Sequence, residues 1–132
     1  MLVRLTVPTR RRSQLEDVTE RVQQVVAGSG VADGLCYVIV PHTTAGVTVN
    51  EAADPSVVHD MLNYLDELVP TDASFLHAEG NSDAHIKAAL LGHSAVLPIE
   101  AGELVLGTWQ GIYLAEFDGP RPRTLLVKVI GG

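Results

Sequence analysis

The last part of the chain, residues 95–130, reads AVLPIEAGELVLGTWQGIYLAEFDGPRPRTLLVKVI. Its apolar runs alternate with short segments rich in Gly, Pro and Glu, and they cover residues 95–99, 104–106, 108–117 and 124–130. Such runs between turn residues are typical of β-strands, and short connections make consecutive strands antiparallel neighbours. We therefore predict that this region forms a mostly antiparallel sheet.

Upstream of residue 95, further elements are expected to complete the sheets and cover them. Strands are predicted over residues 2–7, 35–40 and 47–49, and helical apolar periodicity recurs over residues 14–27, 54–68 and 83–91. The first of these helices follows Ser13-Gln-Leu-Glu16, which has the form of a capping box, and ends at Gly28. The prediction is an α+β fold with about three helices packed on mostly antiparallel sheets.

Length and composition are those of an ordinary globular protein. The 132 residues match one domain, expected over residues 1–132, and 46% of them are apolar. No apolar run approaches the ~20 residues of a membrane helix and no secretory signal is recognisable, so we expect a cytoplasmic protein without a membrane partner. The net charge of −7 argues against binding nucleic acid. Cys36, the single cysteine, is expected to be a small buried hydrophobic residue.

The richest candidate site is the segment His77-Ala-Glu-Gly-Asn-Ser-Asp-Ala-His-Ile-Lys87, which passes from a loop into a predicted helix. Two imidazoles beside carboxylates suit zinc or another divalent metal. The start of a helix also presents unpaired amides to anions such as phosphate, and Lys87 adds a positive charge. A simple helix cap explains Asn81, Ser82 and Asp83 equally well, but not the two histidines beside Glu79.

Two other segments are candidate edges of the same site. His42-Thr-Thr-Ala-Gly46 directly follows a predicted buried strand, and Asn50-Glu51 follows the next one. In residues 108–117 the period of two places Glu116 and Asp118 on one face. These carboxylates are either the polar ends of a buried strand or residues at a pocket mouth, acting as metal ligands or a general base. Arg121, in the following turn, either binds phosphate or is solvated.

Together these motifs resemble the YjbQ-like family, described as secondary thiamine-phosphate synthase enzymes. The resemblance rests on His42-Thr-Thr-Ala-Gly46, Asn50-Glu51, His77-Ala-Glu-Gly-Asn81, Ala84-His-Ile-Lys87, Gly107-Thr-Trp-Gln110 and Glu116-Phe-Asp-Gly-Pro-Arg121. It implies a homotrimer of α+β subunits, with sheets curved into a barrel-like sandwich and a polar pocket near the subunit interface. It also implies that His42, His77 and His85 hold a divalent metal, zinc or magnesium.

Two classes of function follow from the resemblance. The first is a metal-assisted thiamine-phosphate synthase, which joins an aminopyrimidine pyrophosphate to a thiazole phosphate and releases pyrophosphate. In it, the catalytic carboxylates are Glu51, Glu79, Glu116 and Asp118, and the phosphate ligands are Asn81, Lys87 and Arg121. The second is a non-catalytic trimer that binds a metal or a small phosphorylated metabolite through the same residues. A trimer whose polar cluster is merely an interface network is a third possibility.

Overall fold

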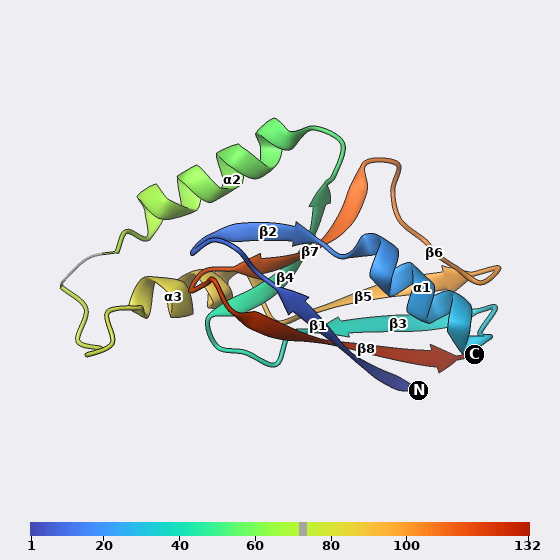
Figure 1. Ribbon diagram of the computed structural model, residues 1–132. Helices are drawn as coiled ribbons and strands as arrows, with labels where there is room; N and C mark the ends of the chain where they lie inside the picture. The colour runs from blue at the N-terminus through green and yellow to red at the C-terminus, as the bar shows by residue number, and fades with distance from the viewer. Residues whose placement is uncertain (72–73) are drawn as a thin grey trace.

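Two antiparallel sheets packed against each other form the centre of the fold (Figure 1). The computed structural model describes residues 1–71 and 74–132. The five-stranded sheet has the order β1-β8-β3-β5-β6, with β1 Leu2–Pro8, β8 Pro122–Gly131, β3 Gly34–Ile39, β5 Ser94–Glu100 and β6 Glu103–Leu104. The three-stranded sheet has the order β2-β7-β4, with β2 Gln14–Asp17, β7 Gln110–Glu116 and β4 Ala45–Glu51.

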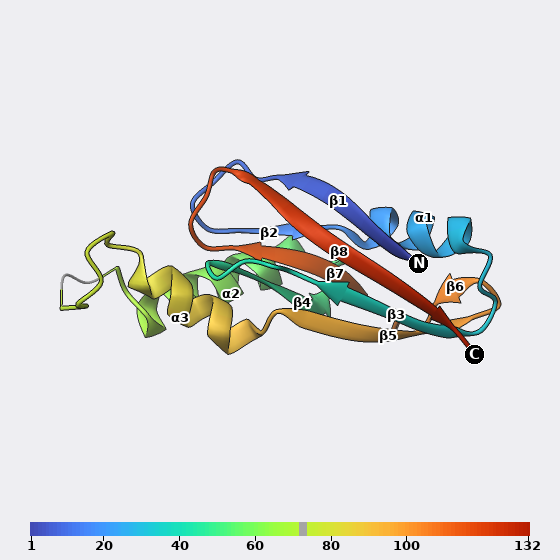
Figure 2. The ribbon, with the colours of Figure 1, turned by 90° about the horizontal axis from the view of Figure 1, so that it is seen from below.

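The three-stranded sheet is covered on both faces (Figure 2). On one face, Ile112 and Leu114 of β7 enter a core shared with β3, β8 and helix α1, Thr19–Ser29. On the other face, Tyr113 and Phe117 pack with helices α2, Pro55–Leu68, and α3, Ser82–Leu91. Burial of both faces explains why apolar residues run continuously through β7, since neither face needs to be polar.

The predicted α+β class with mostly antiparallel sheets is confirmed, but the partners of the last strands differ from the prediction. Residues 108–117 and 124–130 were expected to be neighbours in one sheet. Instead β7 pairs with β2 and β4, and β8 pairs with β1 and β3. The short connection between β7 and β8 therefore crosses from one sheet to the other. This connection contains Asp118 and Arg121, two of the residues predicted to form the site.

The predicted first helix is wrong at its start. Gln14–Asp17 is strand β2, which pairs with residues 113–116 of β7, so Ser13-Gln-Leu-Glu16 caps no helix. Helix α1 begins at Thr19, whose amide donates to Asp17 Oδ1 over 2.9 Å. It ends at Ser29, and its C-cap is Gly30 rather than the predicted Gly28. Pairing with a central strand outweighs the local helix signal here, as tertiary context commonly does.

The other two helices match their predictions. Asp54 caps α2, accepting the Ser56 amide over 2.9 Å, and α3 stops at Gly92. Helix α3 runs close against β4, because a Cβ built on Gly46 would lie 2.5 Å from the carbonyl oxygen of Gly92. Only glycine permits this approach, which fixes α3 beside the strand that follows His42-Thr-Thr.

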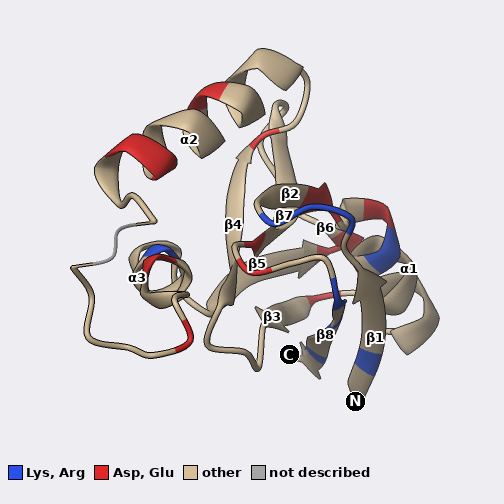
Figure 3. Ribbon diagram, turned by 60° about the vertical axis from the view of Figure 1, so that its left-hand side comes forward, with Lys and Arg blue, Asp and Glu red and all other residues tan. Residues whose placement is uncertain are grey.

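Three further features of the fold concern the length of its helices, the charge of α2 and the environment of Cys36. None of the helices in residues 1–71 and 74–132 has the length and apolar character to cross a membrane. Helix α2 carries Asp60, Asp66 and Glu67 and neither Lys nor Arg, as Figure 3 shows. Cys36 is buried as predicted, and burial raises the pKa of its thiol to about 11, so it stays protonated near neutral pH.

Candidate functional site

A hollow of about 270 Å³ opens where three connections meet. These are the β3–β4 connection, the segment leading into α3 and the β7–β8 connection. We call it the polar hollow, and it is lined by Thr43, Thr44, His77, Glu79, Asn81, His85, Asp118 and Arg121. The structure therefore brings together residues from all three segments that the sequence singled out.

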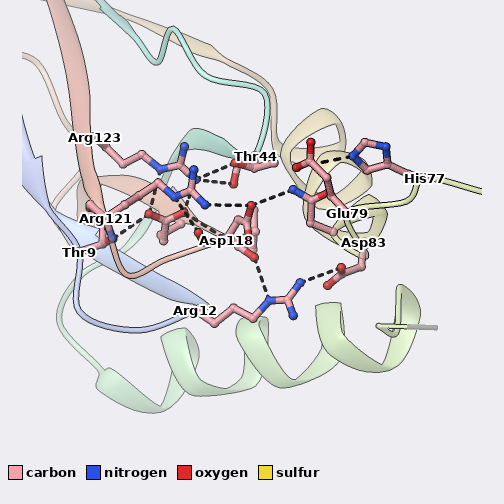
Figure 4. A network of polar contacts seen from close by, with 12 residues as sticks. Thr9, Arg12, Thr44, His77, Glu79, Asp83, Asp118, Arg121 and Arg123 are labelled. Atoms are coloured by element: carbon pink, nitrogen blue, oxygen red, sulfur yellow. Dashed lines mark hydrogen bonds and ion pairs between the residues drawn. The ribbon is translucent and has the colours of Figure 1, made fainter. Parts of the chain in front are cut away.

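The β7–β8 connection is tied to the start of α3 through Asp118 (Figure 4). Asp118 Oδ2 accepts from Asn81 Nδ2 over 2.9 Å and from Arg121 Nη2 over 3.2 Å, and the Asp118 carbonyl accepts from Arg121 Nε over 2.9 Å. Asn81 Oδ1 is buried and has no hydrogen-bond partner in the described part of the chain. A buried acceptor without a partner is unusual, because leaving it unbonded costs free energy.

The histidines of the hollow face each other. The rings of His77 and His85 meet edge to face with centroids 5.5 Å apart, and His77 Nε2 lies 4.0 Å from Glu79 Oε2. Within residues 1–71 and 74–132, no hydrogen bond occupies the ring nitrogens of His85. Imidazoles with free nitrogens can donate to an anion or exchange a proton with a ligand.

His42 is hydrogen-bonded to strand β8. Its Nε2 accepts from the Thr124 amide over 2.9 Å, which leaves that nitrogen unavailable to a metal. No group of three or more His, Cys, Asp or Glu side chains in the described residues is placed to hold a metal ion. The predicted role of His42, His77 and His85 as metal ligands therefore gains no support from the described residues and stays a prediction.

The hydrogen bond to Thr124 makes the state of His42 depend on pH. Burial and the nearby charge of Arg123 lower the pKa of His42 below its ordinary value of 6.5. The neutral ring therefore stabilises the fold above pH 6.5, and this contribution is lost as the pH falls below that value toward the folded pKa. We expect His42→Gln, which keeps an acceptor but cannot titrate, to lose less stability than wild type below pH 6.5. Urea unfolding above and below this pH measures it, and equal losses would contradict the assignment.

Beneath the hollow lies a buried ion pair between Glu116 and Arg123. Glu116 Oε1 accepts from Arg123 Nε over 2.8 Å and from Thr9 Oγ1 over 2.7 Å, and Oε2 accepts from the Asp118 amide over 3.0 Å and from Arg123 Nη2. Burial alone would raise the pKa of Glu116, but these donors outweigh it and lower the pKa. Glu116 does not line the hollow, and its oxygens are already bonded, so a catalytic role for it stays a prediction.

Lys87 is buried on the side of α3 away from His85. Its Nζ lies 2.6 Å from Asp66 Oδ1 and 3.4 Å from Asp83 Oδ2, and Asp83 Oδ1 accepts from Arg12 Nη2 over 2.9 Å. The structure thus places Lys87 outside the polar hollow, where its charge fastens α3 to α2. Of these partners, only Asp83 was detectable from sequence, through its spacing of four residues from Lys87.

Glu51 also lies away from the hollow. It ends β4 opposite Gln110, whereas Ala45 begins β4 opposite Glu116, next to the site. The two ends are six residue steps apart along the strand, which corresponds to ~20 Å. The Glu51 carboxylate accepts the Ala53 amide over 3.0 Å. Within this chain, the structure does not bring Glu51 to the other predicted site residues.

Comparison with known proteins fits this architecture. A family model described as UPF0047 protein YjbQ-like matches residues 3–132. The chain belongs to the UPF0047 family. A UPF0047 protein of Methanocaldococcus jannaschii is 51% identical over 131 residues, covering 99% of this chain and 95% of that protein. YugU of Bacillus subtilis is 45% identical over 132 residues, and the match covers 99% of this chain and 100% of YugU.

Solved structures of UPF0047 relatives have the same fold. A YjbQ/UPF0047 family protein of Clostridium acetobutylicum has a TM-score of 0.95 at 51% identity, covering 97% of this chain and 99% of that one. A protein of Sulfolobus solfataricus, described as YbjQ-like and of unknown function, has a TM-score of 0.96 at 36% identity. The match covers 100% of this chain and 97% of that chain. The likeness extends over the whole fold, including the segments that form the polar hollow.

These UPF0047 relatives correct the predicted reaction. They are described as UPF0047 proteins or as proteins of unknown function, and a Thermus thermophilus structure is described as a conserved hypothetical protein. The prediction of thiamine-phosphate synthase activity, and with it of a transferase, is therefore wrong, because membership of the family assigns no such reaction. The predicted homotrimer stays a prediction.

Proposed function

We propose that this UPF0047 protein binds a small phosphorylated metabolite and holds the phosphate group in the polar hollow. The observation that carries the proposal is the convergence of hydrogen-bond donors on one hollow. The start of α3, the Arg121 guanidinium, two imidazoles and the hydroxyl of Thr43 all border it. Phosphate is the group that such a set of donors suits best.

The donors of the hollow are available to a ligand. Asn81 is the N-cap of α3, and the first amides of a helix have no intrahelical acceptor. Arg121 uses Nε and Nη2 to bond Asp118, while Nη1 makes no hydrogen bond within the described part of the chain. Asp118 therefore orients the guanidinium and leaves one side of it for an anion.

Two carboxylates border the hollow, but neither carries an isolated charge into it. Asp118 is paired with Arg121 and hydrogen-bonded by Asn81. The side chain of Glu79 is 74% exposed, so solvent screens its charge. Arg121 is the one Lys or Arg among the described residues that border the hollow, so it is the main charged donor there for an anion. This makes Arg121 the residue whose loss should weaken binding most.

The size of the hollow limits the ligand. At about 270 Å³ it lies just below the ~300–1,000 Å³ typical of small-molecule sites. It suits a phosphate group with a few further atoms and is too small for a nucleotide. The predicted partner, a small phosphorylated metabolite, is consistent with this size.

We expect Arg121→Gln to weaken the binding of inorganic phosphate about 10- to 150-fold, because a hydrogen bond to a charged group contributes ~1.5–3 kcal/mol. Isothermal titration calorimetry of wild type and variant measures the change. Arg10→Gln is the matched control, since Arg10 is exposed and pairs with Glu16 outside the hollow. Equal affinities for Arg121→Gln and wild type, or an equal loss in the control, would contradict the proposal.

A further inference from the structure

A second hollow, also of about 270 Å³, lies directly beside the polar hollow. Ala45 of β4 and Ala88, Ala89 and Gly92 at the end of α3 form its walls, and His42 and His93 border it. We call it the alanine hollow. It shares Thr43 and His85 with the polar hollow, so these two residues border both hollows.

The chemistry of the alanine hollow differs from that of its neighbour. Of the described residues that line it, none is Asp, Glu, Lys or Arg, and half are alanine or glycine. Its surface therefore offers methyl groups and the edges of imidazole rings rather than charge. Such a surface suits a compact uncharged group, and the rings favour a planar one, since aromatic edges and faces pack against each other.

The small residues keep this space open. Ala88 is buried and Ala89 is exposed, and both lie on the last turns of α3, which Gly46 allows to pack closely on β4. Ala89 is exposed and lines the hollow, so a longer side chain at this position would occupy part of the space. Each hollow alone falls just under the ~300 Å³ lower limit of usual ligand sites, whereas the two together fall within that range.

We infer that the two hollows are halves of one ligand site and that its ligand is a phosphate monoester of a compact, uncharged, planar or apolar group. The phosphate lies in the polar hollow and the organic group lies in the alanine hollow. His85 and Thr43 flank the ester linkage that joins the two groups. This inference rests on the proposed function and extends it, because it names the class of molecule that carries the phosphate.

The test compares phenyl phosphate, glycerol phosphate and inorganic phosphate by calorimetry on the full-length protein. All three share the phosphate, but only phenyl phosphate places a planar apolar group in the alanine hollow. We expect wild type to bind phenyl phosphate about tenfold or more tightly than glycerol phosphate, because apolar surface is buried only with the former. In Ala89→Leu, whose side chain fills the alanine hollow, this preference is lost while the affinity for inorganic phosphate is unchanged.

Ala27→Leu is the matched control, because Ala27 is an exposed alanine on helix α1, remote from both hollows. It should bind all three ligands as wild type does. Wild type could bind inorganic phosphate and yet show no preference for phenyl phosphate over glycerol phosphate. That result would overturn the inference and leave the proposed function standing. If wild type binds no phosphate at all, both fail. An equal loss of inorganic phosphate binding in Ala89→Leu would also overturn the division into two hollows.

Discussion

Replacing Arg123 with methionine is expected to lower the free energy of unfolding by about 3–5 kcal/mol, because it leaves the buried carboxylate of Glu116 without its counter-charge. Glu116 is fully buried and Arg123 is 3% exposed, so water cannot take the place of the guanidinium. Arg123 also donates to Thr44 Oγ1 over 2.8 Å, which connects the pair to the rim of the polar hollow.

Urea unfolding of Arg123→Met measures this loss, and the double variant Arg123→Met with Glu116→Leu is its control. Removing both charges should restore most of the stability, since apolar residues of similar size often replace a buried pair at little cost. The direction in which this contribution to stability changes with pH follows from the pKa of Glu116. Arg123, Thr9 and the Asp118 amide lower the pKa of Glu116, so its contribution is full above the ordinary value of 4.5 and is lost as the pH falls below it. A loss near zero in the single variant would contradict the pairing.

Lys87→Met is the second variant expected to be severely destabilised, by about 3 kcal/mol, because it leaves buried Asp83 without one of its two cations. The cost lies at the lower end of the range for buried pairs, since Arg12 still bonds Asp83 over 2.9 Å. Asp66→Asn is a matched control. The side chain of Asp66 is 59% exposed, so removing its charge should cost less than about 1 kcal/mol.

The same variant separates two roles for Lys87. If Lys87 only fastens α3 to α2, Lys87→Met protein that remains folded should bind inorganic phosphate as wild type does. If Lys87 contacts phosphate, binding should fall with little change in the urea midpoint. The first outcome is expected, because Nζ bonds Asp66 and Asp83 and the residue does not line the polar hollow.

Much of the fold could be predicted from local signals. Helix α2 begins at Asp54-Pro55 and α3 stops at Gly92, as cap chemistry predicts, and strand β3 coincides with a continuous apolar run. Strand β2 could not be predicted, because Gln14–Asp17 is strand only through its pairing with β7, about a hundred residues away along the chain. The local pattern there favours a helix.

The candidate site shows the same division between local and distant information. The sequence brought attention to His77, Glu79, Asn81 and His85, whose density of polar groups is unusual over a short segment, and all four border the polar hollow. The pairing of Glu116 with Arg123 and of Lys87 with Asp66 could not be predicted, because each partner lies on a different strand or helix and only the fold brings it close. Arg123 reaches Glu116 from another sheet, and Arg12 and Asp66 reach the Asp83–Lys87 pair from other elements.

The most direct test of the central claim is a titration of isotopically labelled wild-type protein with inorganic phosphate, followed by amide chemical shifts. Binding in the polar hollow predicts that the largest shifts fall on Thr43 and Thr44, on Asn81 to Asp83 at the start of α3, and on Arg121. They should saturate with a single dissociation constant and be absent in Arg121→Gln at the same concentrations. No saturable shift at these residues, or larger shifts around Arg10 and Arg11, would contradict the claim that this hollow is a phosphate site.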